Sequence, residues 1–226
     1  MLLVGVLLVR LVVTDVYQRF VQTAMGPWLL VAGVLLIGLG LVAVVRALRA
    51  RVPVGGHEDA HEGHHHHGGD RVGWLLLVPV LAVLLAPPPA LGSYGVDRSG
   101  VTVSAGGRTY GLLAPGGPYP MALREFGERA VDAGGDSFAG NPVELTGFVA
   151  RTDDDGGVRL ARFQISCCAA DAVAAVVRFY GADGPPPPQD AWLTVVGTFR
   201  GVGADGVPEM TAATAVPLDA PVDPYE

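Results

Sequence analysis

The stretch Pro27–Val45, PWLLVAGVLLIGLGLVAVV, runs for 19 residues without a charged side chain. A bilayer core about 30 Å thick is crossed by roughly 20 consecutive apolar residues in an α-helix. A buried helix of a soluble protein is the alternative, but such a helix is seldom apolar on every face over this length. The stretch therefore predicts a transmembrane helix and a membrane protein.

Two further apolar stretches flank this one. Residues 72–91, VGWLLLVPVLAVLLAPPPAL, carry no charge. Pro79 is tolerated there when neighbouring groups satisfy the freed carbonyl, so we expect a kinked span. Residues 2–21 are apolar until Arg10, and an intramembrane charge is costly and often functional. Residues 1–94 are therefore predicted to form a membrane region of two or three helices, at about residues 2–21, 27–45 and 72–91.

Arginines mark both ends of the loop between the two longest apolar stretches, residues 53–71. They are Arg46, Arg49, Arg51 and Arg71. An excess of arginine in a short loop predicts that the loop is cytoplasmic. We therefore expect the chain in the plasma membrane, with this loop inside the cell and residues 95–226 on the extracytoplasmic side.

Charge is distributed unevenly along the chain. Residues 1–94 hold 6 arginines and 5 acidic residues, whereas residues 95–226 hold 9 arginines and 17 acidic residues. Nucleic-acid binding needs a basic surface that can neutralise phosphates. We therefore expect no nucleic-acid partner.

The C-terminal part is predicted to be mainly β. After a Gly- and Pro-rich linker at residues 95–118, a short amphipathic helix is expected from Pro120, with Leu123, Phe126 and Ala130 on one face. Strand patterns follow at residues 142–150, 157–167, 175–181, 191–201 and 208–218. Short strands with short turns predict a small antiparallel barrel over residues 119–226. An OB-like barrel is the first choice and a small sandwich the second.

The predicted strand at residues 157–167 changes its apolar pattern midway. Val158 and Leu160 occupy even positions, whereas Phe163 and Ile165 occupy odd ones. Side chains alternate between the two faces of a strand, so these pairs would face opposite ways. A one-residue bulge would bring them to the same face.

The only two cysteines of the chain, Cys167 and Cys168, are adjacent in RFQISCCAADA. Neighbouring Cα atoms are about 3.8 Å apart, whereas disulfides prefer roughly 4.4–6.8 Å, so a bond between the two would be strained. On a strand, one thiol would enter the core and the other would meet solvent. Four interpretations remain: a strained redox pair, a thiolate metal site helped by Asp171, an intermolecular link, and small side chains that fill a tight turn.

All six histidines fall in HEDAHEGHHHH, within the loop at residues 53–71. They are His57, His61, His64, His65, His66 and His67. Neutral imidazole is a common ligand of zinc, nickel and copper, and the carboxylates interspersed here can complete a coordination set. We therefore interpret this segment as a low-selectivity collector or sensor of divalent ions rather than as a catalytic zinc site. The alternative is a solvated spacer.

Taken together, these features resemble the YcgQ-type family of bacterial membrane proteins, whose members are labelled permease subunits. The resemblance spans nearly the whole chain, and RFQISCCAADA is its most specific part, supported by VELTGFVA, VRFYG and AWLTVVGTF. It implies an extracytoplasmic C-terminal β domain and a larger multi-span permease as partner. Among candidate site residues it extends only to Cys167, Cys168 and Asp171.

The leading hypothesis is a non-enzymatic accessory subunit of a membrane permease complex. It would handle a divalent metal, Zn²⁺ or another transition ion, and its partners would be the bilayer and a multi-span permease. Two strong spans are too few to form a pore alone. The alternative is a membrane-anchored thiol redox or redox-sensing protein that uses Cys167 and Cys168, although the chain has no CxxC motif. An anchored β module with no metal role is a third possibility.

Overall fold

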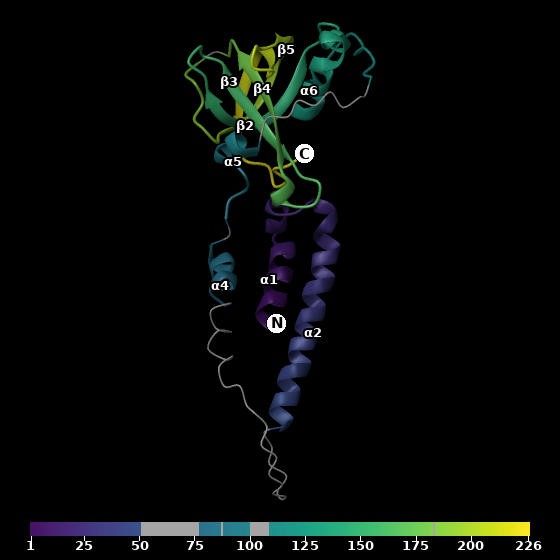
Figure 1. Ribbon diagram of the computed structural model, residues 1–226, viewed down its shortest axis with the longest axis vertical. Coiled ribbons are helices and arrows are strands. Elements are labelled where there is room, and N and C mark those ends of the chain that lie inside the picture. The colour runs from purple at the N-terminus through teal and green to yellow at the C-terminus, as the bar shows by residue number, and fades with distance from the viewer. Residues whose placement is uncertain (51–76, 87, 100–108, 183) are drawn as a thin grey trace, which may run out of the picture. The chain divides into compact units, whose positions relative to one another are not determined.

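The computed structural model describes residues 1–50, 77–86, 88–99, 109–182 and 184–226 (Figure 1). The chain forms two compact units. The first comprises Met1–Tyr17 and Thr23–Pro88, and the second comprises Gln18–Gln22 and Pro89–Glu226. The short segment 18–22, which joins the first two helices, thus belongs to the C-terminal unit.

The N-terminal unit is helical. Its α-helices are α1 (Leu2–Val13), α2 (Gly26–Ala50) and α4 (Leu77–Leu85), and η2 (Thr23–Met25) is a short 3₁₀ turn. A second 3₁₀ turn, η1 (Val16–Arg19), begins in this unit and ends in the segment 18–22 of the C-terminal unit. The prediction of one helix over residues 2–21 is wrong, because α1 ends at Val13. Asp15 has a left-handed φ of 56°, which an α-helix cannot accommodate and which Asp adopts more readily than most residues.

One helical segment of the described chain, Thr23–Arg49, is long and apolar enough to cross a membrane. Its 27 residues include the predicted span at residues 27–45. By length and composition it can serve as a membrane anchor, and a signal sequence near the N-terminus has the same properties. Helix α1, with 12 residues, is shorter than a span. Within the predicted span at residues 72–91, the described residues form the helix Leu77–Leu85, and residues 86 and 88–91 lie outside it. Residues 72–76 and 87 are not described, so the number of spans stays a prediction.

Glycines let α1 and α2 approach closely. A Cβ atom added to Gly5 would lie 2.8 Å from the Gly33 carbonyl oxygen, and one on Gly40 would lie 2.6 Å from Leu2 Cγ. At such short distances neither position has room for a larger residue unless the neighbouring atoms shift. Small residues at helix interfaces allow such packing in membrane proteins, where no hydrophobic effect drives helices together.

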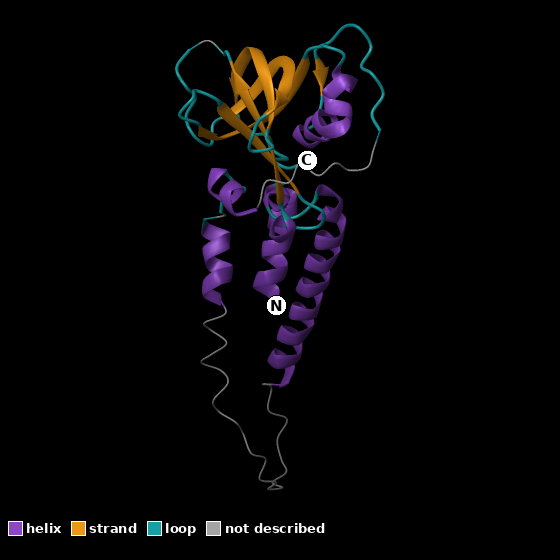
Figure 2. Cartoon of the chain, turned by 45° about the horizontal axis from the view of Figure 1, so that its top comes forward, coloured by secondary structure: helices purple, strands orange, loops and turns teal. Residues whose placement is uncertain are grey.

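The C-terminal unit contains a closed five-stranded barrel (Figure 2). Its strands are β2 (Val143–Thr152), β3 (Val158–Gln164), β4 (Val173–Tyr180), β5 (Trp192–Val202) and β6 (Pro208–Leu218), preceded by the two-residue β1 (Tyr119–Pro120). The order is β2-β3-β4-β6-β5, and β2 pairs with β5 to close the ring. The β4–β6 pair is parallel and the other pairs of the ring are antiparallel. The barrel prediction is confirmed, and closure excludes the sandwich.

Helix α6 (Leu123–Val131) and the turn η3 (Asp132–Phe138) pack against the barrel core. Leu123, Phe126 and Ala130 are at most 1% exposed, which confirms the predicted apolar face of this helix. Their partners in the core are strand residues such as Leu145, Leu193 and Met210. The barrel is therefore filled by side chains and is no channel.

A second apolar cluster lies on the other face of β3 and explains its changing pattern. Val158 and Leu160 join the first core, whereas Phe163 and Ile165 join the second, which includes residues of helix α5 (Ser93–Ser99) and the C-terminal segment. The register of β3 against β4 is continuous from residue 158 to residue 164, so the predicted bulge in this strand is wrong. Both faces of β3 are buried, and no bulge is needed to reconcile them.

Candidate thiol site

Cys167 and Cys168 lie in the connection between β3 and β4. Strand β3 ends at Gln164, and the 3₁₀ turn η4 (Ala169–Asp171) follows the doublet. Cys167 is exposed and Cys168 is half-buried. The expectation that one thiol enters the core is wrong, because the doublet stands beyond the end of β3, where side chains no longer alternate between core and solvent.

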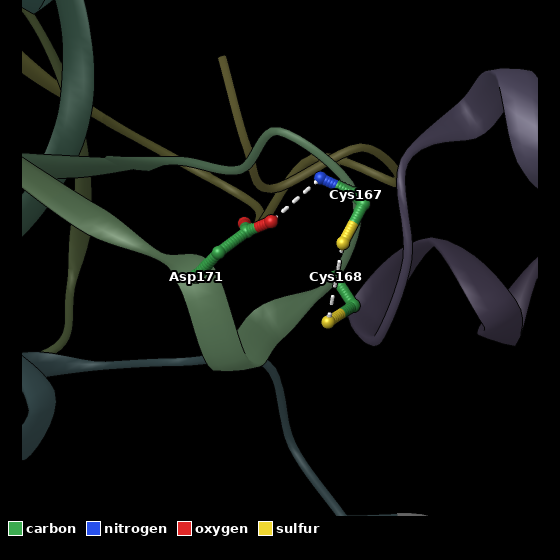
Figure 3. Close-up of side chains that lie close together, drawn as sticks. All are labelled: Cys167, Cys168 and Asp171. Atoms are coloured by element: carbon green, nitrogen blue, oxygen red, sulfur yellow. Dashed lines mark hydrogen bonds between the residues drawn. The ribbon is translucent and has the colours of Figure 1, made fainter.

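Asp171 organises this turn (Figure 3). Its carboxylate accepts hydrogen bonds from the backbone N–H groups of Ser166 at 2.9 Å and Cys167 at 2.8 Å. The backbone N–H of Asp171 donates to the Cys168 carbonyl at 3.0 Å. The carboxylate therefore fixes the backbone of Ser166 and Cys167, and the Asp171 backbone N–H fixes the carbonyl of Cys168.

The three side chains form a compact set of possible metal ligands. The two sulfur atoms are 3.6 Å apart, and the two sulfurs and a carboxylate oxygen all lie within 4.8 Å of one another. Thiolates select zinc and softer ions, and a carboxylate can complete such a set. Within the described ranges this is the one cluster of three or more such groups. Three ligands from the chain leave a coordination position for a further ligand.

The thiol and the carboxyl group influence each other's protonation. Hydrogen bonding to Asp171 and to Cys168 raises the pKa of the Cys167 thiol to about 12. Hydrogen bonds from the Cys167 thiol and from the Ser166 N–H lower the pKa of Asp171. The Cys167 thiol is therefore protonated at neutral pH, and a metal ion that binds its sulfur must displace that proton.

The segment 18–22 pairs with the doublet as a short antiparallel bridge. Val21 lies opposite Cys168, the Gln22 N–H donates to the Cys167 carbonyl at 3.1 Å, and the Ala169 N–H donates to the Phe20 carbonyl at 2.7 Å. We call residues 18–22 the connector. Sequence reasoning missed this pairing, because a bridge between segments so far apart in the chain leaves no local pattern.

Tyr225 holds the connector from a second direction. Its side chain is 5% exposed, and its hydroxyl donates to the Arg19 carbonyl at 2.7 Å and accepts from the Leu91 N–H at 3.3 Å. The last residue, Glu226, accepts from the Leu123 N–H at the start of α6 at 2.9 Å. The C-terminal segment thus ties the connector, the entry to the C-terminal unit at residue 91, and α6 to one another.

A groove of about 230 Å³ lies beside the site. Asp171 and Ser166 line it together with α6 and the first half of β4. Arg124 of α6 donates to the buried carboxylate of Glu128 at 2.7 Å and also to the Gln164 side chain. The charged groups named here on the α6 side of the groove are therefore already paired with one another.

Other charged residues gather at the turns β2–β3 and β5–β6. Arg178 is 10% exposed in its side chain and contacts three carboxylates, those of Asp153, Asp205 and Glu209. Arg159 contacts Asp153 at 2.8 Å and Asp205 at 2.7 Å. The charges of these two arginines are therefore balanced by neighbouring carboxylates of the same network.

The six predicted histidine ligands, His57 to His67, lie outside the described residues. The His-Glu-x-x-His spacing occurs twice within them, at His57–His61 and at His61–His65. Sequence reasoning overlooked it. A catalytic zinc site needs this spacing on a helix, so that both imidazoles share one face. The interpretation of the segment as a non-catalytic metal collector stays a prediction.

Comparison with known proteins assigns both parts of the chain. No curated protein matches it. Residues 1–102 match the DUF1980 N-terminal domain, and residues 129–225 match the DUF1980 C-terminal domain. The first match covers the helical region, and the second covers the barrel together with the thiol site. The chain therefore belongs to the DUF1980 family.

Proposed function

We propose that this chain is a non-enzymatic accessory subunit of a membrane permease complex and that it handles a divalent metal ion. The observation that supports this most directly is the cluster of Cys167, Cys168 and Asp171, with its ligand atoms within 4.8 Å. Two sulfurs and an oxygen favour Zn²⁺ or another transition ion over Mg²⁺ or Ca²⁺, which prefer oxygen ligands. The site is accessible from solvent, as a site that exchanges its metal should be.

The proposal places the chain in the plasma membrane through the apolar segment Thr23–Arg49. The arginines at positions 46, 49, 51 and 71 favour a cytoplasmic loop at residues 53–71, and the OB-like barrel would then lie outside the cell. The histidine segment would collect metal on one side of the bilayer and the thiol site would bind it on the other. A reporter fused after residue 226 that is active only in the cytosol would overturn this orientation.

A thiol redox function is the competing proposal. It draws on the proximity of the two sulfurs, 3.6 Å apart. Geometry counts against it, since adjacent residues cannot reach the Cα separation that disulfides prefer without strain. An anchored module that only assembles partners is supported by no particular feature of the site.

The decisive experiment is elemental analysis of the full-length chain purified from native membranes, with identification of the proteins that accompany it. We expect about one zinc or similar ion per chain in a variant lacking residues 57–67, and loss of that ion in the same variant carrying Cys167→Ser. A permease should copurify with both. Equal metal content in the two variants would exclude the thiol cluster as the binding site.

A further inference from the structure

The thiol site is not formed by its own turn alone. The carbonyl of Cys167 and the N–H of Ala169, on either side of Cys168, are both engaged by the connector through Gln22 and Phe20. Cys168 itself is extended, with φ −153° and ψ 168°, as a bridged strand residue should be. The backbone of the doublet is therefore held on one side by Asp171 and on the other by the connector.

We infer that the connector positions the thiols, so that metal binding at Cys167, Cys168 and Asp171 and ordering of the connector stabilise each other. This rests on the proposed metal function. The physical reason is preorganisation: a ligand set that is already held in place loses less conformational freedom when the metal binds. Coupling between two sites is reciprocal, so bound metal must also strengthen the bridge.

The position of the connector in the chain gives this coupling a consequence. The connector begins directly after Tyr17, the last residue of the stretch that contains α1. It ends directly before Thr23, the first residue of the apolar segment that contains α2. Covalent continuity thus joins the thiol site to the ends of two apolar helices. Metal binding at the thiol site would then restrain the five residues of the connector, which link the part of the chain that contains α1 to the part that contains α2.

A proline substitution isolates the hydrogen bond that matters. Gln22→Pro removes the N–H that donates to Cys167, whereas Gln22→Ala removes the side chain and keeps this N–H. One backbone hydrogen bond changes an equilibrium constant by about fivefold. In the full-length chain in detergent, we expect Gln22→Pro to weaken Cd²⁺ binding by about this factor, measured by thiolate–Cd²⁺ absorbance, and Gln22→Ala to leave it unchanged.

Two further readouts separate the inference from the proposed function. Cd²⁺ should slow hydrogen exchange at the Gln22 and Ala169 amides of the wild type, and Cys167→Ser should abolish this protection. Without metal, iodoacetamide should modify Cys168 faster in Gln22→Pro than in Gln22→Ala, because Cys168 is half-buried while it is bridged to the connector.

The measurements distinguish failure of the proposed metal function from failure of the connector to position the thiols. Absence of Cd²⁺ binding in the wild type would refute the proposed function, and the metal coupling with it, whereas the alkylation rates would still report whether the connector positions the doublet. Equal Cd²⁺ affinity and equal alkylation in Gln22→Pro and Gln22→Ala would overturn the inference alone. Should Gln22→Pro fail to fold, Tyr225→Phe serves instead, because it removes the hydroxyl that binds Arg19. It should then show the same changes in Cd²⁺ affinity and alkylation.

Discussion

Arg178 on β4, whose carboxylate partners lie at the β2–β3 and β5–β6 turns and on β6, gives the sharpest stability prediction. Arg178→Met removes the partner of three carboxylates: Asp153 at 2.9 Å, Glu209 at 3.0 Å and Asp205. Two of these carboxylates, Asp153 and Glu209, are 16% exposed, so their charges cannot be fully hydrated once the guanidinium is gone. Removing one partner of a buried ion pair costs about 3–5 kcal/mol. Because Asp205 is 37% exposed and Arg159 remains, we expect the lower end, about 3 kcal/mol.

This loss should be visible as a lowered unfolding temperature. For a unit of this size, about 3 kcal/mol corresponds to a decrease of roughly 10 °C. The fluorescence of Trp192, half-buried on β5, reports on the barrel when Trp28 and Trp74 are changed to phenylalanine in the full-length chain in detergent.

The matched control is Arg200→Met, which removes an exposed arginine that stacks over the Tyr180 ring at 4.7 Å. An exposed cation–π contact is worth about 0.5–1 kcal/mol, so a decrease of only a few degrees is expected. If Arg178→Met lowers the midpoint no further than Arg200→Met does, the charge network does not stabilise the barrel.

Three other predictions concern acid, a glycine turn and helix packing. Burial raises the pKa of Asp205, but hydrogen bonds and neighbouring arginines outweigh it and leave the pKa below the ordinary value. A carboxyl group with a depressed folded-state pKa stabilises above its unfolded pKa. The barrel should therefore lose stability as pH falls below about 4, and Asp205→Asn should flatten that dependence in a thermal-unfolding series. Gly135→Ala should destabilise by about 3 kcal/mol in urea unfolding, because φ is 86° and the added Cβ would lie 2.1 Å from a phenylalanine ring. Gly134→Ala, with φ 65° and open space, should cost only about 1 kcal/mol. Gly5→Leu should speed hydrogen exchange throughout α1, since Gly5 has no room for a side chain, and Gly38→Leu, which meets open space, should not. Equal exchange in these two variants would show that α1 and α2 do not depend on close packing.

The barrel keeps its filled interior apart from the turn that holds the thiols. The barrel interior is filled, and Arg159 and Arg178 are paired with aspartates and, for Arg178, also with Glu209. The cluster of possible metal ligands among the described residues lies outside this interior, at the Cys167–Asp171 turn. The filled barrel thus serves as the scaffold that carries the thiol turn, an arrangement that is common for sites placed on loops.

The strand positions could be predicted because stretches of β2 and β5 bury alternate residues on the inside of the barrel. Leu145 and Val143 on β2, and Leu193 and Val195 on β5, follow this period of two. The prediction of a bulge failed on β3, because Phe163, and Ile165 just beyond the end of the strand, belong to a second cluster. Alternation reveals one buried face, and a strand with two buried faces requires knowledge of what covers the second.

The thiol site also has one part that the sequence predicted and one part that only the tertiary structure revealed. The composition of the chain singles out Cys167 and Cys168, and the CCAADA motif adds Asp171, because residues so close in sequence must be close in space. The connector could not be predicted, since its bridge to Cys168 joins residues far apart in the chain and consists of backbone hydrogen bonds, which carry no side-chain signature.

Local chemistry thus sufficed for the apolar helix at residues 27–45, the amphipathic helix α6, the five strands and the clustering of the thiols, because each is a short-range pattern of polarity or identity. Closure of the barrel through β2 and β5, burial of both faces of β3, and attachment of the connector to the doublet were decided only by the tertiary structure. All three depend on which distant segments meet, and a pattern read along one segment does not specify its partner.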